Sequence, residues 1–159
     1  MSHQYPHTLK LCCNRNVARA FCQFLQNPNS VLEKLNLSCN AIRDDVAAAL
    51  TNAFINNSRL RELDFSTNRS ITLTGWMAFL TVLLNPISVL EKLNLSCNEM
   101  INEVVEAVTT SLAANTRLRE LDLSCNFNIT TAGWVTFSKR STQSQHSVGE
   151  TAHACQFYK

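Results

Sequence analysis

Three cysteines recur at one position of a repeated sequence and are the first candidates for chemistry. Cys39, Cys97 and Cys125 each precede an asparagine, and Thr67 takes the corresponding place in a fourth copy. A row of thiolates could hold a soft metal ion or exchange disulfides. The threonine interrupts the row, however, and no histidine stands at matching spacing. We therefore expect small buried residues beside a turn, and no metal site.

Other candidate groups for catalysis or metal binding form no complete set. His146, His153 and Cys155 have part of a metal-ligand spacing, but they lie in a polar C-terminal segment. Asp64 and Asp122 are paired carboxylates in form, yet the repeats place them two strands apart on an open face, where acid–base chemistry has no pocket. All four histidines lie near the termini, and three glycines supply no phosphate loop. We expect no catalytic residue, no cofactor and no enzymatic activity.

Composition indicates one globular domain. The chain has 159 residues, 45% of them hydrophobic and 16% charged, with a net charge of +2. That charge is too small to indicate a nucleic-acid or membrane-surface partner. No apolar run approaches the roughly 20 residues of a membrane span, and the N-terminus lacks the pattern of a secretory signal. We therefore expect a cytoplasmic protein whose seven cysteines are thiols.

Four copies of one pattern define the elements. The string VLEKLNLSCN occupies residues 31–40 and again 89–98, while LRELDFSTN and LRELDLSCN occupy 60–68 and 118–126. In the first copy Leu35 and Leu37 alternate with polar residues, which predicts a short strand with one buried face. In the third repeat the strand is expected at Glu62 to Ser66.

Each strand is followed by apolar residues at helical spacing. In the second repeat these fall at i, i+4, i+7, i+8 and i+11 and form one helical face; they are Ile42, Val46, Ala49, Leu50 and Ala53. In the third repeat two extra residues precede a helix predicted from Trp76 to Leu84. Short and long repeats alternate, so the larger unit has 58 residues.

The repeats divide the chain into three parts. Residues 1–8 are expected to be a flexible N-terminus. The repeat domain is predicted over 9–137, and residues 138–159 are polar and predicted to be disordered. Within the domain the repeats are assigned to 9–31 (partial), 32–59, 60–89, 90–117 and 118–137 (partial).

The pattern L-x-x-L-x-L-x-x-N with a 28–30-residue period resembles the leucine-rich repeat family, and its alternating lengths resemble the ribonuclease-inhibitor-like subclass. The resemblance implies an α/β solenoid, a short horseshoe arc with parallel β-strands on the concave face and α-helices on the convex face. Neighbouring repeats must stack to bury their leucines. The family's asparagines bond the backbone of the turn and form a ladder, a role that the resemblance assigns to Asn40, Asn68, Asn98 and Asn126.

The outward strand positions of the concave face are the family's usual binding surface. They form three columns. Opposite charges alternate between neighbouring strands in the lysine–glutamate column, and the asparagine–aspartate column leaves two net negative charges. Two interpretations stay open: a weakly acidic, serine-lined groove for basic or hydrogen-bonding side chains of a partner, or charges that satisfy one another after duplication. The candidate binding residues are Lys34, Glu62, Lys92 and Glu120; Asn36, Asp64, Asn94 and Asp122; and Ser38, Ser66, Ser96 and Ser124.

Three functions fit these observations. The first is a non-enzymatic scaffold or interaction module for a protein partner that the sequence does not name. The second is a regulator, an activator or inhibitor of an enzyme such as a small GTPase or nuclease, with Arg69 as its loop candidate. The third is a fragment of a larger repeat protein without independent function. Uncapped repeat ends also predict self-association.

Overall fold

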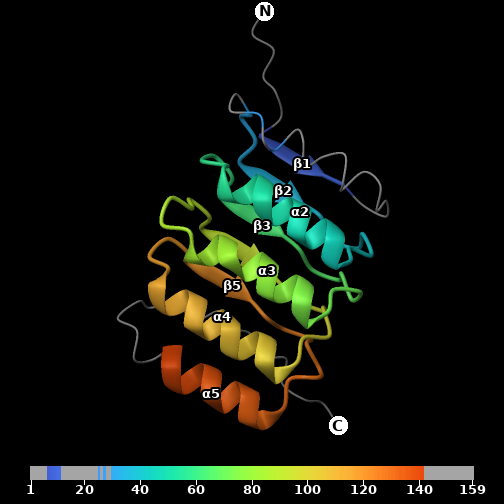
Figure 1. Ribbon diagram of the computed structural model, residues 1–159, viewed down its shortest axis with the longest axis vertical. Coiled ribbons are helices and arrows are strands. Elements are labelled where there is room, and N and C mark those ends of the chain that lie inside the picture. The colour runs from blue at the N-terminus through green and yellow to red at the C-terminus, as the bar shows by residue number, and fades with distance from the viewer. Residues whose placement is uncertain (1–6, 12–24, 26, 28–29, 142–159) are drawn as a thin grey trace, which may run out of the picture.

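The computed structural model describes residues 7–11, 25, 27 and 30–141. Strands alternate with helices along this part of the chain (Figure 1). The strands are β1 (Thr8–Lys10), β2 (Lys34–Asn36), β3 (Glu62–Asp64), β4 (Lys92–Asn94) and β5 (Glu120–Asp122). The helices are α2 (Asp44–Ile55), α3 (Leu73–Leu84), α4 (Asn102–Ala114) and α5 (Thr131–Ser141).

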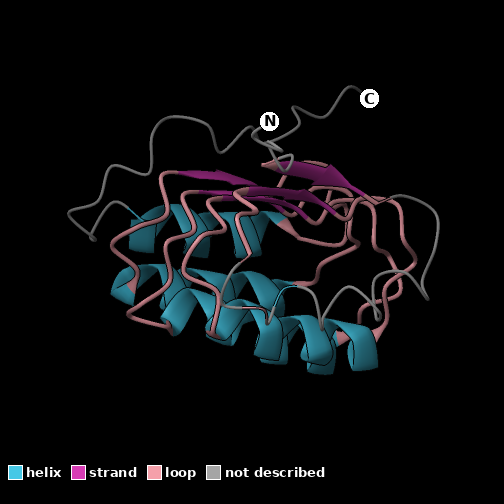
Figure 2. Cartoon of the chain, turned by 90° about the horizontal axis from the view of Figure 1, so that it is seen from above, coloured by secondary structure: helices cyan, strands magenta, loops and turns pink. Residues whose placement is uncertain are grey.

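The elements form two layers. The five strands make one parallel sheet in chain order, β1 to β5, and the helices lie together on one side of it (Figure 2). A helix is about 10 Å wide and a strand spacing about 4.8 Å, so the stack curves with the strands inside. The fold is the predicted α/β leucine-rich-repeat solenoid, with strands on the concave and helices on the convex face.

The register of the sheet agrees with the predicted columns. Lys34 of β2 pairs with Glu62 of β3, Glu62 with Lys92 of β4, and Lys92 with Glu120 of β5. The central leucine of every strand faces the helices, and those of β2 to β5 are buried. One face of the sheet is therefore core and the other carries the polar columns.

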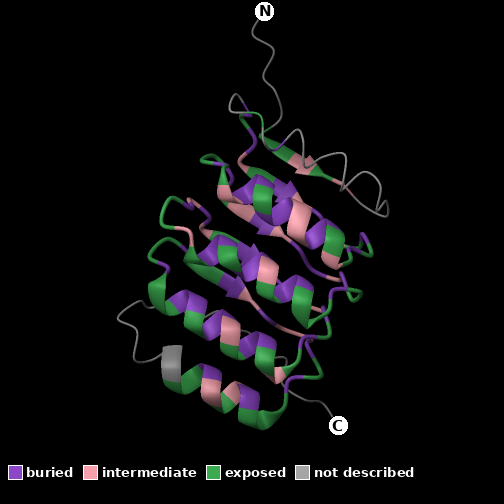
Figure 3. Ribbon diagram, in the orientation of Figure 1, coloured by how far each residue is buried: buried purple, intermediate pink, exposed green. Residues whose placement is uncertain are grey.

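The core is formed by buried residues of both the strands and the helices, which alternate with exposed ones along each helix (Figure 3). The predicted inner face of α2 is buried except for Ala49, which is half-buried. In the third repeat Phe65, Trp76 and Phe79 pack as a cluster, with the rings of Phe65 and Phe79 stacked at 4.7 Å and Trp76 edge-on to both. Trp76 is therefore a core residue, whereas Trp134 in the fifth repeat is half-buried.

Two element boundaries differ from the predictions. Strand β3 ends at Asp64 instead of Ser66, because the Ser66 N–H donates to the Asp64 carboxylate rather than to a neighbouring strand. Helix α3 begins at Leu73 instead of Trp76, so Gly75 lies inside its first turn. A Cβ at Gly75 would lie 2.3 Å from the Oδ1 atom of Asp44, so a contact from the preceding repeat accounts for this glycine.

The expectation that the repeated cysteines are buried is wrong. Cys39 is exposed, and Cys97 and Cys125 are half-buried. These three residues and Thr67 share a left-handed backbone, with φ between 56° and 60°. The left-handed residue turns the chain so that the following asparagine points inward, which leaves the cysteine position toward the surface.

Some predictions lie partly or wholly outside the described residues. They concern most of the N-terminal segment 1–8, the helix of the first repeat and residues 142–159 with their histidines. Helix α5 continues to Ser141, four residues past the predicted domain end at 137. None of the described helices has the length and apolar character needed to cross a membrane.

Candidate functional site

A ladder of buried asparagines joins the repeats beside the sheet. The Asn68 Nδ2 group donates to the carbonyls of Leu37 and Phe65, at 3.0 and 3.1 Å. Its Oδ1 atom accepts from the N–H groups of Asn40 and Ile42, at 3.1 and 3.2 Å. Each amide therefore satisfies backbone groups of its own repeat and of the preceding one. Asn40, Asn98 and Asn126 occupy the same place.

A second asparagine ladder lies at the opposite end of the helices, and the sequence analysis missed it. The Nδ2 groups of Asn57, Asn85 and Asn115 each donate to a carbonyl of the preceding repeat. The Asn115 Oδ1 atom accepts from the N–H groups of Arg117 and Leu118, which fixes the turn into the next strand. The signal was the recurrence of asparagine at intervals of 28 and 30 residues.

Ion pairs cross the junctions between neighbouring strands on the concave face. Lys34 pairs with Glu62 at 2.9 Å and Lys92 with Glu120 at 2.7 Å. Between β3 and β4 the pairing moves one residue back, where Arg61 contacts Glu91. The predicted alternation of charge is therefore realised as ion pairs across β2–β3, β3–β4 and β4–β5.

Lys92 binds Glu120 of the next strand at 2.7 Å. Its hydrogen bond to Glu120 raises the pKa of its ammonium group above 10.5, and the nearby carboxylates of Glu62 and Glu91 raise it further. The lysine therefore stays charged and directed at Glu120. Glu62, on the other side of Lys92, pairs with Lys34 instead.

The asparagine–aspartate column has a structural role in addition to its place on the surface. Asn36, Asp64, Asn94 and Asp122 each accept a hydrogen bond at Oδ1 from the N–H of the serine two residues later, at 2.9 to 3.1 Å. These turns end the strands. Ser66 and Ser96 are buried at 9% exposure, so the serine column adds little surface. Because aspartate and asparagine make the same bond, the charges of Asp64 and Asp122 are not needed for the turn.

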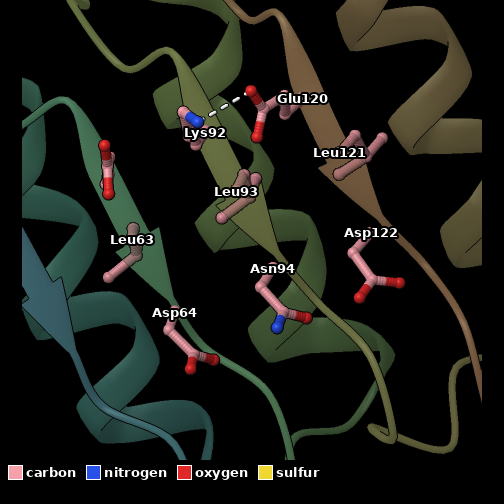
Figure 4. Close-up of a pocket in the computed structure, with 9 residues that line it drawn as sticks. Leu63, Asp64, Lys92, Leu93, Asn94, Glu120, Leu121 and Asp122 are labelled. Carbon is pink, nitrogen blue, oxygen red and sulfur yellow. Dashed lines mark ion pairs between the residues drawn. The ribbon is translucent and has the colours of Figure 1, made fainter. Parts of the chain in front are cut away.

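The residues of β3, β4 and β5 line a groove on the concave face (Figure 4). Four carboxylates, from Glu62, Asp64, Glu120 and Asp122, face one ammonium, from Lys92. The lining side chains carry a formal charge of −3, but Glu62 pairs with Lys34 and Glu120 with Lys92, so the charge without an ion-pair partner is that of Asp64 and Asp122. The groove agrees with the predicted weakly acidic face, and its lining residues come from β3, β4 and β5.

The remaining candidates for chemistry do not assemble. Asp64 and Asp122 lie on either side of Asn94, each bonded to its own turn. No group of three or more metal-ligating side chains occurs among the residues that the structure describes. Arg69, the loop candidate for a regulator, lies 3.8 Å from Glu99 of the next repeat.

Comparisons with known proteins agree with this architecture. The model of the family described as Leucine Rich repeat matches residues 29–50 and 114–137, which supports a leucine-rich repeat family. A solved structure titled Leiomodin-1 Actin-Binding Site 2 (ABS2) has a TM-score of 0.62 at 19% identity, covering 86% of this chain and 82% of that one. This similarity shows the fold. No curated protein matches the sequence.

Proposed function

We propose that the chain is a non-enzymatic protein-interaction module whose concave groove binds a basic segment of a partner protein. The proposal rests on one observation, the four carboxylates and single lysine that line the groove between β3 and β5. A partner's arginine or lysine side chains would complement this charge and find the Asp64 and Asp122 carboxylates on an open sheet face.

The pattern of ion pairs also leaves the groove negatively charged. Lys92 is bound to Glu120, and Arg61 is bound to Glu91, so these cations do not neutralise the aspartate column. The column has no aromatic side chain of the kind that dominates tight interfaces. We therefore expect moderate affinity that falls with salt.

The groove is tested with a synthetic peptide of alternating arginine and serine, titrated into the isotopically labelled chain. Amide shifts should concentrate on β3 to β5, and an alternating glutamate–serine peptide should cause none. Asp122→Asn keeps the Oδ1 acceptor for Ser124, as Asn94 does for Ser96, so it removes charge without altering the turn. It should weaken binding about fivefold. Shifts elsewhere, or equal affinity for the variant, would refute the groove as the site.

Capture from a native extract then identifies the partner. The similar structure is titled for actin binding, so purified actin is one of the proteins to assay. A nucleotide-loaded GTPase or a nuclease among the captured proteins would favour the regulator instead. We further infer the ribonuclease-inhibitor-like subclass from the alternating 28- and 30-residue repeats. We also infer a cytoplasmic location, where the free thiols of Cys39, Cys97 and Cys125 would stay reduced.

A further inference from the structure

The third repeat is one of the longer repeats, and its junction with the fourth shows which groups contact the strand edge of a long repeat. The backbone N–H groups of Phe65 and Thr67 donate to carbonyls of the next repeat, at Asn94 and Ser96. The N–H of Asn68 donates to the Asn98 side chain. On the surface, Arg61 pairs with Glu91. The strand that covers a long repeat is thus parallel and carries glutamate opposite arginine.

The fifth repeat is the equivalent of the third, 58 residues later, and presents the same groups. Arg119 corresponds to Arg61, Leu123 to Phe65 and Asn126 to Asn68. Within the described residues β5 is the edge of the sheet. Among the residues that the structure describes, the N–H groups of Leu123 and Asn126 at this edge have no acceptor, and the Arg119 side chain has no carboxylate partner.

The side chains of the fifth repeat are more exposed than their equivalents in the third, which leaves the β5 edge accessible to another strand. The Glu120 side chain is 54% exposed, against 34% for Glu62, its equivalent in the third repeat. Phe127 is 73% exposed and corresponds to Arg69, whose side chain reaches Glu99 of the following repeat. An aromatic side chain therefore stands where the long repeat contacts its neighbour.

We propose that the edge of β5 is an interaction surface that takes a parallel β-strand of a partner protein. The strand carries an acidic residue opposite Arg119, followed by a basic one, as in Glu91-Lys92. Its backbone continues the sheet, which is the mode of strand addition. Phe127 contacts the segment that follows the strand. This surface lies at the edge of β5, and the acidic groove beside it shares Glu120 and Asp122 with that strand.

A partner chain fits better than a second copy of this chain. The acidic–basic pattern occurs in the described strands at Glu33-Lys34 and Glu91-Lys92. The strands at both places are already covered on the side that would face β5, the first by β1 and the second by β3. A second copy would have to break its own sheet to supply the strand.

The test uses the full chain and a synthetic peptide with the sequence of Val89–Asn98, in which Cys97 is replaced by serine. We expect the peptide to shift the amides of Leu123 and Asn126 and to leave β1 unaffected. Arg119→Glu should weaken binding at least fivefold, and a peptide with arginine in place of Glu91 should restore it. Phe127→Ala should weaken binding of a longer peptide that extends past Asn98.

Two methylated peptides provide matched controls for the edge. In the sheet the Lys92 N–H points to the preceding strand, where it donates to Arg61, and the Leu95 N–H points to the following strand, where it donates to Asp122. Methylation at the Lys92 amide should therefore abolish binding, while methylation at the Leu95 amide should not.

Three results would overturn the proposal. Equal binding of the two methylated peptides would exclude strand addition, and the absence of shifts at β5 would show that the edge is closed in the full chain. If the chain alone forms oligomers in sedimentation that Arg119→Glu dissociates, the occupant is a second copy and the assignment to a partner protein is wrong.

Discussion

The Asp44 carboxylate binds Thr72 of the next repeat through both of its oxygens. The Thr72 N–H donates to Oδ1 at 2.8 Å and the Thr72 hydroxyl to Oδ2 at 2.5 Å. Thr72 is the residue that precedes α3, so a side chain from one repeat anchors the start of the helix of the next. Asn102 takes the corresponding place before α5, where its Oδ1 atom accepts from the Thr130 N–H and its Nδ2 group donates to the Thr130 hydroxyl.

Removing the Asp44 side chain should therefore destabilise the junction between the second and third repeats. Asp44→Ala leaves the Thr72 N–H without its acceptor, and we expect a loss of about 1 kcal/mol in the free energy of unfolding. Asp44→Asn should cost less, because Asn102 makes the equivalent bond. Denaturant unfolding of the three proteins measures the difference. An equal loss in both variants would contradict this role.

Gly75→Ala should destabilise the protein, although alanine usually improves a helix. The new Cβ would lie 2.3 Å from the Asp44 Oδ1 atom and 2.8 Å from the Ile71 Cγ2 atom. We expect a loss of about 1–3 kcal/mol. Thermal unfolding checks it, and in an Asp44→Ala background the loss should shrink. A more stable Gly75→Ala protein would show that the contact is not tight.

Asn68→Ala should be the most damaging of these substitutions. It removes two donors to the carbonyls of Leu37 and Phe65 and the acceptor for the N–H groups of Asn40 and Ile42, in a fully buried place. Each buried group left unpaired costs about 1–3 kcal/mol, so we expect a loss of at least about 3 kcal/mol. Asn56→Ala, at an exposed position, is the control and should change stability little.

The Lys92–Glu120 pair should make stability depend on pH in the alkaline range. The hydrogen bond to Glu120 raises the pKa of Lys92 above 10.5 in the folded chain, so folding favours the protonated lysine. The contribution of protonated Lys92 to the free energy of unfolding is fully present below the pKa that the lysine has in the unfolded chain. It is lost as the pH rises through the higher pKa of the folded chain. The stability difference between the protein and Lys92→Gln should thus narrow above pH 10.5. Lys10→Gln, which removes no ion pair with a described residue, should show no such narrowing.

Thr67 occupies a backbone conformation that suits other residues better. Its φ of 57° is left-handed, which β-branched side chains rarely adopt and asparagine tolerates. We expect Thr67→Asn to raise the free energy of unfolding by about 1 kcal/mol. Thr74→Asn, on the exposed surface of α3, should give no gain. Calorimetry on both variants decides whether the strain is real.

The repeated string was sufficient to predict the fold and the register of the sheet. Leucines at fixed intervals require stacking, and stacking in register places Lys34 beside Glu62. The second asparagine ladder was present in the same intervals. It was missed because Asn57, Asn85 and Asn115 lie in turns, and the sequence of a turn does not reveal that its side chain bonds to the preceding repeat.

Other features depend on contacts that one repeat does not reveal. The early start of α3 follows from Asp44 in the preceding repeat. The surface position of Cys39 follows from its left-handed backbone. Neither glycine nor asparagine, the residues typical of that conformation, stands at this position, so the sequence does not predict it. The negative groove depends on which of two possible neighbours Lys92 binds, and the sequence offers Glu62 and Glu120 equally.

The identity of residues 31–40 and 89–98 also affects how the chain folds. Strand β1 of the first repeat pairs with β2. The ten-residue string that contains β2 is identical to the string that contains β4. A folding chain can therefore dock the later string in the place of the earlier one, with the intervening 58 residues looped out. Such a species satisfies every local contact of that junction, so its correction is slow. We expect refolding to show a slow phase that disappears when one copy of the string is made different from the other.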